Sequence, residues 1–301
     1  MVEYYTTVTA LGIRFWDMTL DRQVSDNLVV KAYPVLGTGP VVSAFRSASG
    51  IYGFQGLPGM QAIELKKSDN EGIGVPGSPP FMKSFYIEVT DKLNRFLPVI
   101  FTVELPLPYP VYLSDDPVFS GGSPGSGNPP GFYLFSSPSR TVSPGLAAIH
   151  AALVEQATGR PAAYAVLQVD VQGAGGENVG ILYGIADERG CISILFPYPD
   201  MEVSLSGSPP PNSPDSLEQQ EWQLTLQVRY EPGELKTPDN INIEPKIPLL
   251  KEIFNQKEGK IWTKKPADEP DENLSTVLTF GEPLILRTKG VEKSELWIDQ
   301  I

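Results

Sequence analysis

The chain has one histidine and one cysteine, His150 and Cys191, which limits the chemistry that it can do. A zinc site takes several ligands from His and Cys, and neither residue has a second such side chain near it in sequence. A Ser-His-Asp triad also needs a serine held on a strand-to-helix turn, and we predict no such turn. We therefore interpret His150 as a hydrogen-bonded strand residue and Cys191 as a small buried side chain. Catalysis by carboxylates alone stays open, but the sequence predicts a chain that is not an enzyme.

Glycine-rich and acidic stretches offer weaker candidates. The run 121–125 lacks the Lys-Ser/Thr pair of a phosphate-binding loop and is interpreted as linker. Asp115 and Asp116 could hold calcium weakly or form a solvated turn. The acidic run 268–272 predicts a solvated loop or, alternatively, a contact with basic residues of an assembly partner.

Four aromatic residues, Trp16, Tyr52, Phe54 and Trp222, allow two interpretations. They fit the core of a β-sandwich, since apolar and polar or small residues alternate around them. As exposed rings beside polar groups they would instead form a sugar-binding platform. We expect the core.

The net charge of −13 is unevenly spread. Residues 1–150 carry −2 (10 basic against 12 acidic side chains) and residues 151–301 carry −11 (13 against 24). Nucleic acid and anionic membranes need a basic face, so both are poor partners. The second half suits a basic partner surface, or its acidic groups serve solubility. No apolar run reaches the roughly 18–20 residues of a spanning helix, and no Sec signal is recognisable. We therefore expect a cytoplasmic protein without a cofactor.

The elements that position these residues come in two copies, one over residues 19–60 and one over residues 157–201. Each copy predicts a turn, an apolar strand, a variable loop, and a hairpin closed by a glycine turn. The aligned pairs are Gly50 with Gly190, an offset of 140 residues (190 − 50), and Arg22 with Arg160, an offset of 138 (160 − 22).

Composition and repeats together predict an all-β chain. Thirty Pro and 28 Gly disfavour long helices. We expect two related small β-sandwich domains, residues 1–113 and 146–301, joined by a Pro/Gly-rich linker over residues 114–145. One short helix is predicted near 248–256, where Pro248 precedes an apolar stripe.

Two apolar segments stand outside the repeats and are too hydrophobic to be left in water. As strands, they would add to the edge of a sheet, in this chain or in a partner. They give the predicted partner-docking residues, which are Phe132, Tyr133, Leu134 and Phe135 in the linker and Leu296, Trp297 and Ile298 near the end of the chain.

The repeat resembles the small β-sandwich modules of the carboxypeptidase regulatory-like and transthyretin-like families. The likeness lies in residues 185–190, in residues 50–54 and in Leu57-Pro58. It covers under a third of the chain and implies a fold, not an activity.

A second resemblance bears on function. Residues 45–59, 95–98 and 157–165 look like those of a protein from bacterial gene clusters for contractile injection systems. These phage-tail-like machines have an inner tube, a contractile sheath, a baseplate and an end cap. The resemblance implies a structural part at the cap end, a cap or cap adaptor that contacts sheath, tube or cap proteins. It also implies a homo-oligomeric ring, six-fold like the machine. Alternatives are a baseplate position and a carbohydrate- or surface-binding β-sandwich.

Overall fold

The computed structural model describes residues 9–36, 39–64, 82–107, 120–121, 131–173, 178–199, 220–239, 241, 246–265 and 269–300. These residues form strands and turns almost throughout, which confirms the all-β prediction. The predicted short helix is also confirmed, as α2 (Leu250–Phe254). The other helical pieces described are single turns, α1 (Gln61–Glu64) and the 3-10 turn Pro232–Glu234.

The chain divides into two compact units. Unit 1 comprises Met1–Leu134 with Thr237–Leu250, and unit 2 comprises Phe135–Lys236 with Lys251–Ile301. The sequence predicts boundaries at residues 113 and 146 instead. The difference arises because part of the predicted linker forms strands of unit 1, and because a later segment of the chain returns to that unit.

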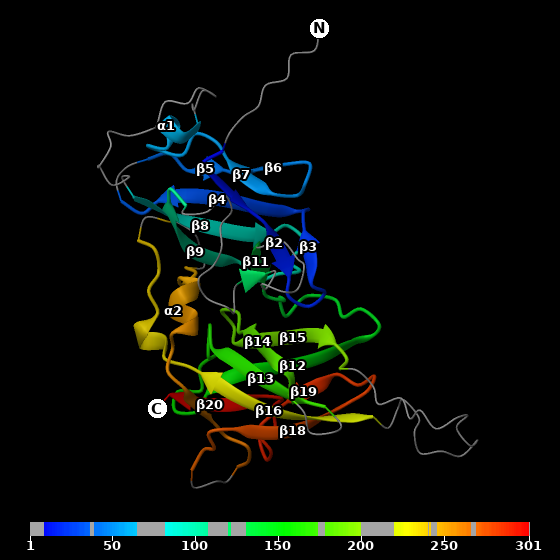
Figure 1. Cartoon of the computed structure of the whole chain (residues 1–301). Coiled ribbons are helices and arrows are strands. Elements are labelled where there is room, and N and C mark those ends of the chain that lie inside the picture. Colours follow the sequence, from blue (N-terminus) through cyan, green and yellow to red (C-terminus); the bar gives the residue numbers. More distant parts are fainter. Residues whose placement is uncertain are drawn as a thin grey trace, which may run out of the picture. The chain divides into compact units, whose positions relative to one another are not determined.

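The described strands of unit 1 form three sheets (Figure 1). Two of them share one extended segment, which changes sheets at Arg14. In hydrogen-bonded order, the first sheet has β1 (Leu11–Ile13), β7 (Tyr52–Phe54) and β6 (Phe45–Arg46). The second has β10 (Ser120–Gly121), β11 (Gly131–Leu134), β2 (Phe15–Asp17) and β3 (Arg22–Val24). The third has β5 (Val42–Ser43), β4 (Leu28–Pro34), β8 (Lys83–Asp91) and β9 (Val99–Leu105).

Unit 2 contains two sheets that face each other across one hydrophobic core. The first sheet has the order β15 (Cys191–Pro197), β12 (Leu146–Glu155), β20 (Leu296–Gln300) and β17 (Gly259–Ile261), with β19 (Leu284–Leu286) also paired to β12. The second has the order β14 (Asn178–Ile185), β13 (Val166–Gln172), β16 (Glu221–Arg229) and β18 (Leu274–Thr279).

The cores follow from alternation along the strands. In β16, Trp222, Leu224, Leu226 and Val228 are buried while the residues between them face outward. The aromatic residues predicted for the core are all buried, at 5% exposure or less. The interpretation of these rings as core is confirmed, and they form no exposed platform.

The two units pair their strands in the same order. In unit 1, β1 lies antiparallel to β7, which follows the turn at Gly50, with Leu11 opposite Phe54. In unit 2, β12 lies antiparallel to β15, which follows the turn at Gly190, with Ile149 opposite Ile194. Likewise, β4 lies between β5 and β8 in unit 1, and β13 lies between β14 and β16 in unit 2.

The glycine turns agree in detail. Gly50 and Gly190 have φ of +76° and +74°, a region open to glycine at little cost. The amide of Gly50 donates to the carbonyl of Ser47 at 3.1 Å, and that of Gly190 to the carbonyl of Asp187 at 3.0 Å. One polar side chain closes each turn: Ser47 Oγ accepts from the Ile51 amide at 3.0 Å, and Asp187 Oδ1 from the Cys191 amide at 2.8 Å.

Candidate functional site: the predicted docking segments

The two predicted docking segments occupy equivalent places in the two units. In unit 1, β11 lies parallel to β2, with Phe132 opposite Phe15. In unit 2, β20 lies parallel to β12, with Leu296 opposite Leu153. Phe15 and Leu153 are 138 residues apart (153 − 15), the offset of the aligned arginines. We call β11 and β20 the closing strands, because β11 adds to β2 in unit 1 and β20 adds to β12 in unit 2.

Most of the predicted docking side chains are buried within their own unit. Phe132, Leu134, Phe135, Leu296 and Ile298 are each at most 1% exposed. The ring of Phe132 stacks on Phe101 of β9 with centroids 4.2 Å apart and meets Phe15 edge to face at 6.1 Å. Burial of this kind stabilises each side chain by roughly 1.5–3 kcal/mol, so these five residues stabilise the fold of their units.

Glycine allows β11 to approach the first strand closely. A Cβ at Gly131 would lie 2.5 Å from the ring of Trp16 and 2.7 Å from the carbonyl oxygen of Arg14. The amide of Phe132 donates to that same carbonyl at 2.8 Å. The glycine-rich composition of this stretch, which predicts a linker, thus also serves tight strand packing.

Tyr133 and Trp297 are the half-buried members of the predicted set. The Tyr133 hydroxyl donates to Asp21 Oδ1 at 3.0 Å. The ammonium group of Lys265 lies 4.5 Å from the centre of the Trp297 ring, a cation–π geometry. Partner docking by the seven residues stays a prediction, and these two side chains offer the surface for it.

The two residues with reactive side chains, His150 and Cys191, lie on the paired strands β12 and β15, where His150 is opposite Ser193 and Cys191 is opposite Ala152. His150 is half-buried in β12 on the face opposite Ile149 and Ala151, and burial lowers its pKa. Cys191 is half-buried, not fully buried as expected, and burial together with Asp187 raises its thiol pKa. In the described part of the chain, no three His, Cys, Asp or Glu side chains gather as metal ligands would.

The remaining sequence candidates fall largely outside the described residues. Asp115, Asp116 and residues 122–130 are among these. The spacing of Gly121, Ser123 and Gly125 also matches a nucleophile elbow, a point that the sequence reasoning above missed; Gly121 ends the two-residue strand β10. Of the acidic run 268–272, Asp271 accepts a hydrogen bond from the Thr263 hydroxyl at 2.6 Å.

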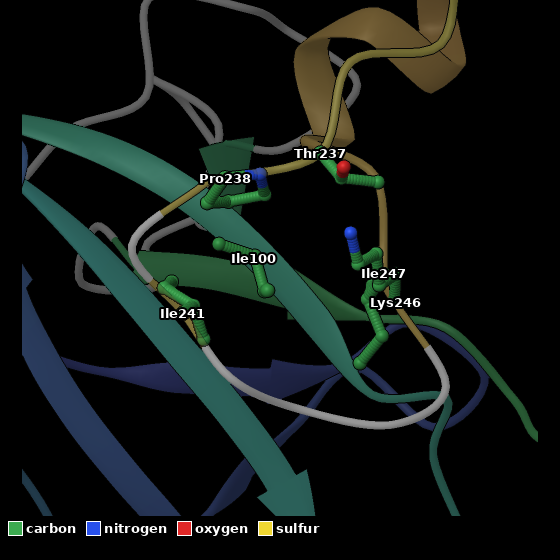
Figure 2. A pocket seen from close by; sticks show the side chains of 6 residues that line it. All are labelled: Ile100, Thr237, Pro238, Ile241, Lys246 and Ile247. Carbon is green, nitrogen blue, oxygen red and sulfur yellow. The ribbon is translucent and has the colours of Figure 1, made fainter.

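A strap of unit 1, the described part of Thr237–Leu250, packs Ile241 and Ile247 against Ile100 of β9. Figure 2 shows the small pocket between them, with an empty volume of about 170 Å³, part of it open to solvent. Small-molecule sites usually enclose about 300–1,000 Å³. The pocket is therefore a packing gap of mostly aliphatic walls, not a ligand site.

A buried carboxylate lies on the same face of the β4–β8–β9 sheet as Ile100. Glu88 is 4% exposed and accepts a hydrogen bond of 2.6 Å from the Tyr33 hydroxyl, with Lys31 Nζ 3.7 Å away. Burial and the bond to Glu88 raise the pKa of Tyr33. Tyr33 and Lys31 satisfy the Glu88 carboxylate, so this group is structural. The sequence analysis did not single out Ile241 and Ile247, whose apolar side chains indicate that the strap packs on β9.

Comparison with other proteins adds no relative. The sequence matches no protein-family model, no curated protein and no solved structure.

No described helix has the length and hydrophobicity needed to cross a membrane.

Proposed function

We propose that this chain is a non-enzymatic structural subunit of a contractile injection system, located at the cap end, where it joins the terminus of sheath and tube. The observation that supports the proposal best is the duplicated sandwich. Each of the two units has corresponding strand pairs and is closed by a strand from outside its repeat, as expected of a structural subunit without a reactive centre. The resemblance of residues 45–59, 95–98 and 157–165 to a protein of contractile injection systems supports this kind of particle.

Charge supports a basic partner within such a particle. Unit 2, residues 135–236 and 251–301, carries 13 basic and 22 acidic side chains, a net charge of −9 (13 − 22), so a sheath, tube or cap surface with clustered Lys and Arg would attract it. Because exposed charges are screened with a Debye length of about 10 Å at 0.1 M salt, this association weakens as salt rises. A ring of copies would multiply the same attraction.

Co-sedimentation tests the proposal. Sheath–tube particles assembled without this protein are mixed with the purified chain and sedimented, and labelled chain is located by electron microscopy. We expect binding at one end of the particle, weaker binding in high salt, and weaker binding of the double variant Tyr133→Ala/Trp297→Ala than of the control Leu93→Ala, an exposed residue of unit 1. Chain that stays in the supernatant contradicts the proposal, and binding at the baseplate end supports the alternative position.

A second candidate, glycan binding, rests on the outer face of the sheet β14-β13-β16-β18. Amide, hydroxyl and carboxylate side chains form cross-strand rows there, with Gln168 opposite Gln227, Gln172 opposite Gln223, and Asp170 opposite Thr225. The amide groups donate and accept hydrogen bonds without net charge, the hydroxyl does the same, and the Asp170 carboxylate accepts. Retention of the chain on a polysaccharide column, reduced by Gln227→Ala, would favour this function over the scaffold.

A further inference from the structure

Strand β14 is an open edge of unit 2. Among the described residues it pairs with β13 alone, from Ile185 opposite Val166 to Asn178 opposite Gln172. It contains no Asp, Glu, Lys, Arg or Pro. Its exposed face carries Val179 and Ile181, each 48% exposed. Proteins usually protect an edge with charges, proline or a covering segment, because free backbone groups invite another strand.

The other edges in the described part of the chain differ from β14. Strand β15 pairs only with β12 and has no charged residue, but its residues Ile192 to Phe196 are buried and it ends at Pro197. In unit 1, β9 is covered at Ile100 by a parallel bridge to Leu249 of the strap, and β5 is only two residues long. In unit 2, β18 has hydroxyl side chains and follows the acidic pair Asp271-Glu272. Strands β15 and β18 are also uncharged, but among the described edges β14 combines eight residues without charge or proline with two exposed apolar side chains, Val179 and Ile181.

The sequence of β14 is compatible with pairing to itself. In an antiparallel pair centred on Leu182, Ile181 of one copy lies opposite Tyr183 of the other, and Gly180 lies opposite Gly184. An aromatic residue opposite a β-branched one is a favourable cross-strand pair. No like charges meet. A Cβ at Gly180 would meet nothing within 4 Å, so there is open space beside this glycine, whereas the space beside Gly184 is filled by Ile192 and Ile194. A register centred on Tyr183 would instead set Ile181 against Ile185, which is already buried in its own unit.

We propose that two copies of this chain associate through β14, antiparallel about a two-fold axis, so that two four-stranded sheets become continuous. This inference is independent of the particle proposed above. A single pair of strand edges buries less than the roughly 1,200–2,000 Å² of a standard stable interface, so the dimer should be concentration-dependent. Each copy carries a net charge of −13, so salt should strengthen the dimer by screening repulsion. The basic-partner contact has the opposite salt dependence.

Sedimentation equilibrium of the full chain tests the proposal. We expect a monomer–dimer equilibrium that shifts toward dimer with added salt. Ile181→Lys places a charge on the edge and should weaken the dimer at least about tenfold, which corresponds to 1.4 kcal/mol or more. Ile285→Lys is the matched control, since Ile285 is 57% exposed in β19 of the same unit; it should leave the dimer unchanged. A monomer at every concentration and salt, or equal effects of the two variants, would overturn the proposal.

Cross-linking tests the register without relying on a folded lysine variant. In a Cys191→Ala background, Ile181→Cys and Tyr183→Cys chains are mixed and oxidised. Opposite residues lie about 4.5–5.5 Å apart between Cα atoms, within disulfide reach, whereas diagonal ones lie about 7–8 Å apart. We expect a disulfide-linked dimer in the mixture and far less in either variant alone. Equal cross-linking in all three samples, or none in the mixture, contradicts the pairing.

Discussion

Unit 1 and unit 2 differ in the segment that precedes the glycine turn, which is β5 and β6 in unit 1 and β14 in unit 2. In unit 1 this segment is split, because β5 pairs with β4 of one sheet and β6 pairs with β7 of another. In unit 2 the corresponding β14 stays with β13 over its whole length. The two units share an order of strands, but this segment connects two sheets in unit 1 and forms an open sheet edge in unit 2.

The glycine turns show a second difference beneath a shared geometry. A Cβ at Gly50 would meet the side chains of Gln23 and Ser25, at 2.5 and 2.7 Å. A Cβ at Gly190 would meet the carbonyl oxygen of Leu153 at 2.4 Å and the amide of Ala162 at 3.1 Å. The Gln23 amide ends a flexible side chain and can move aside, whereas the Ser25 Cβ moves only with its backbone. At Gly190 both contacts are backbone atoms, and the backbone there is held by hydrogen bonds between Leu153 and Gly190 and between Ala162 and Leu153. Equivalent positions in a repeat can therefore differ in tolerance because of what packs against them.

The closing strands should give the largest effects, and equal ones. Leu134 and Ile298 are 0% exposed and lie opposite Asp17 and Glu155, 138 residues apart (155 − 17). Replacing either by Ala should lower the free energy of unfolding of its own unit by about 2–5 kcal/mol, because a cavity replaces buried methyl groups. Hydrogen exchange read separately for each unit measures this. Ile285→Ala, on an exposed strand position, serves as the control. A loss in one unit only would break the equivalence.

The glycine turns should separate the units. Gly50→Ala should cost about 1–2 kcal/mol, the price of a left-handed conformation for a residue with a Cβ. Gly190→Ala should cost about 1–3 kcal/mol more, because its Cβ is forced into backbone. Urea unfolding of the two variants gives the comparison. Equal costs would show that the loop around residues 153–162 can shift.

Acid should act first on unit 1. Burial by itself raises the pKa of Asp91, but hydrogen bonds from the side chain and backbone of Arg95 outweigh it and lower that pKa below 3.8. Asp91 Oδ2 accepts from Arg95 Nε at 2.9 Å and from its amide at 2.8 Å. A lowered pKa stabilises the fold above pH 3.8 and the contribution is lost as pH falls through the folded-state pKa.

The variant Asp91→Asn should therefore lose about 2 kcal/mol at neutral pH. Between pH 5 and pH 2 the stability of its unit 1 should fall less than that of the parent protein, since one titrating group is gone. Acid titration followed by the fluorescence of Trp16, the tryptophan of unit 1, measures the difference. An unchanged titration curve would contradict the role of Asp91.

The side chains that close the glycine turns should give the smallest effects. Ser47→Ala removes one hydrogen bond to the Ile51 amide, and about 1 kcal/mol is expected. Asp187→Ala removes charge-assisted bonds to the amides of Arg189 and Cys191 and should cost about twice as much. Thermal unfolding of each variant provides the values. A larger loss for Ser47→Ala would reverse the expected order.

Much of the fold follows from patterns that depend on local physics. Alternation predicts the strand that becomes β16, and the apolar stripe after Pro248 predicts α2. The left-handed turns at Gly50 and Gly190 follow from glycine alone. The docking segments are recognisable as strands because they are too apolar for water. Which strand each one would join was not readable, since parallel pairing between residues 15 and 132 leaves no local trace.

Residue types and short spacings alone account for the strand-rich composition, the duplicated turns, the excess negative charge of the second half and the scarcity of His and Cys. These properties depend on residue type and on spacings of a few positions. Three features become visible only in the folded chain: the strap belongs to unit 1, the apolar segments add to strands of their own units, and β14 has one neighbouring strand among the described residues. Those outcomes depend on contacts between residues far apart in the chain, where competing pairings differ by packing that no short stretch encodes.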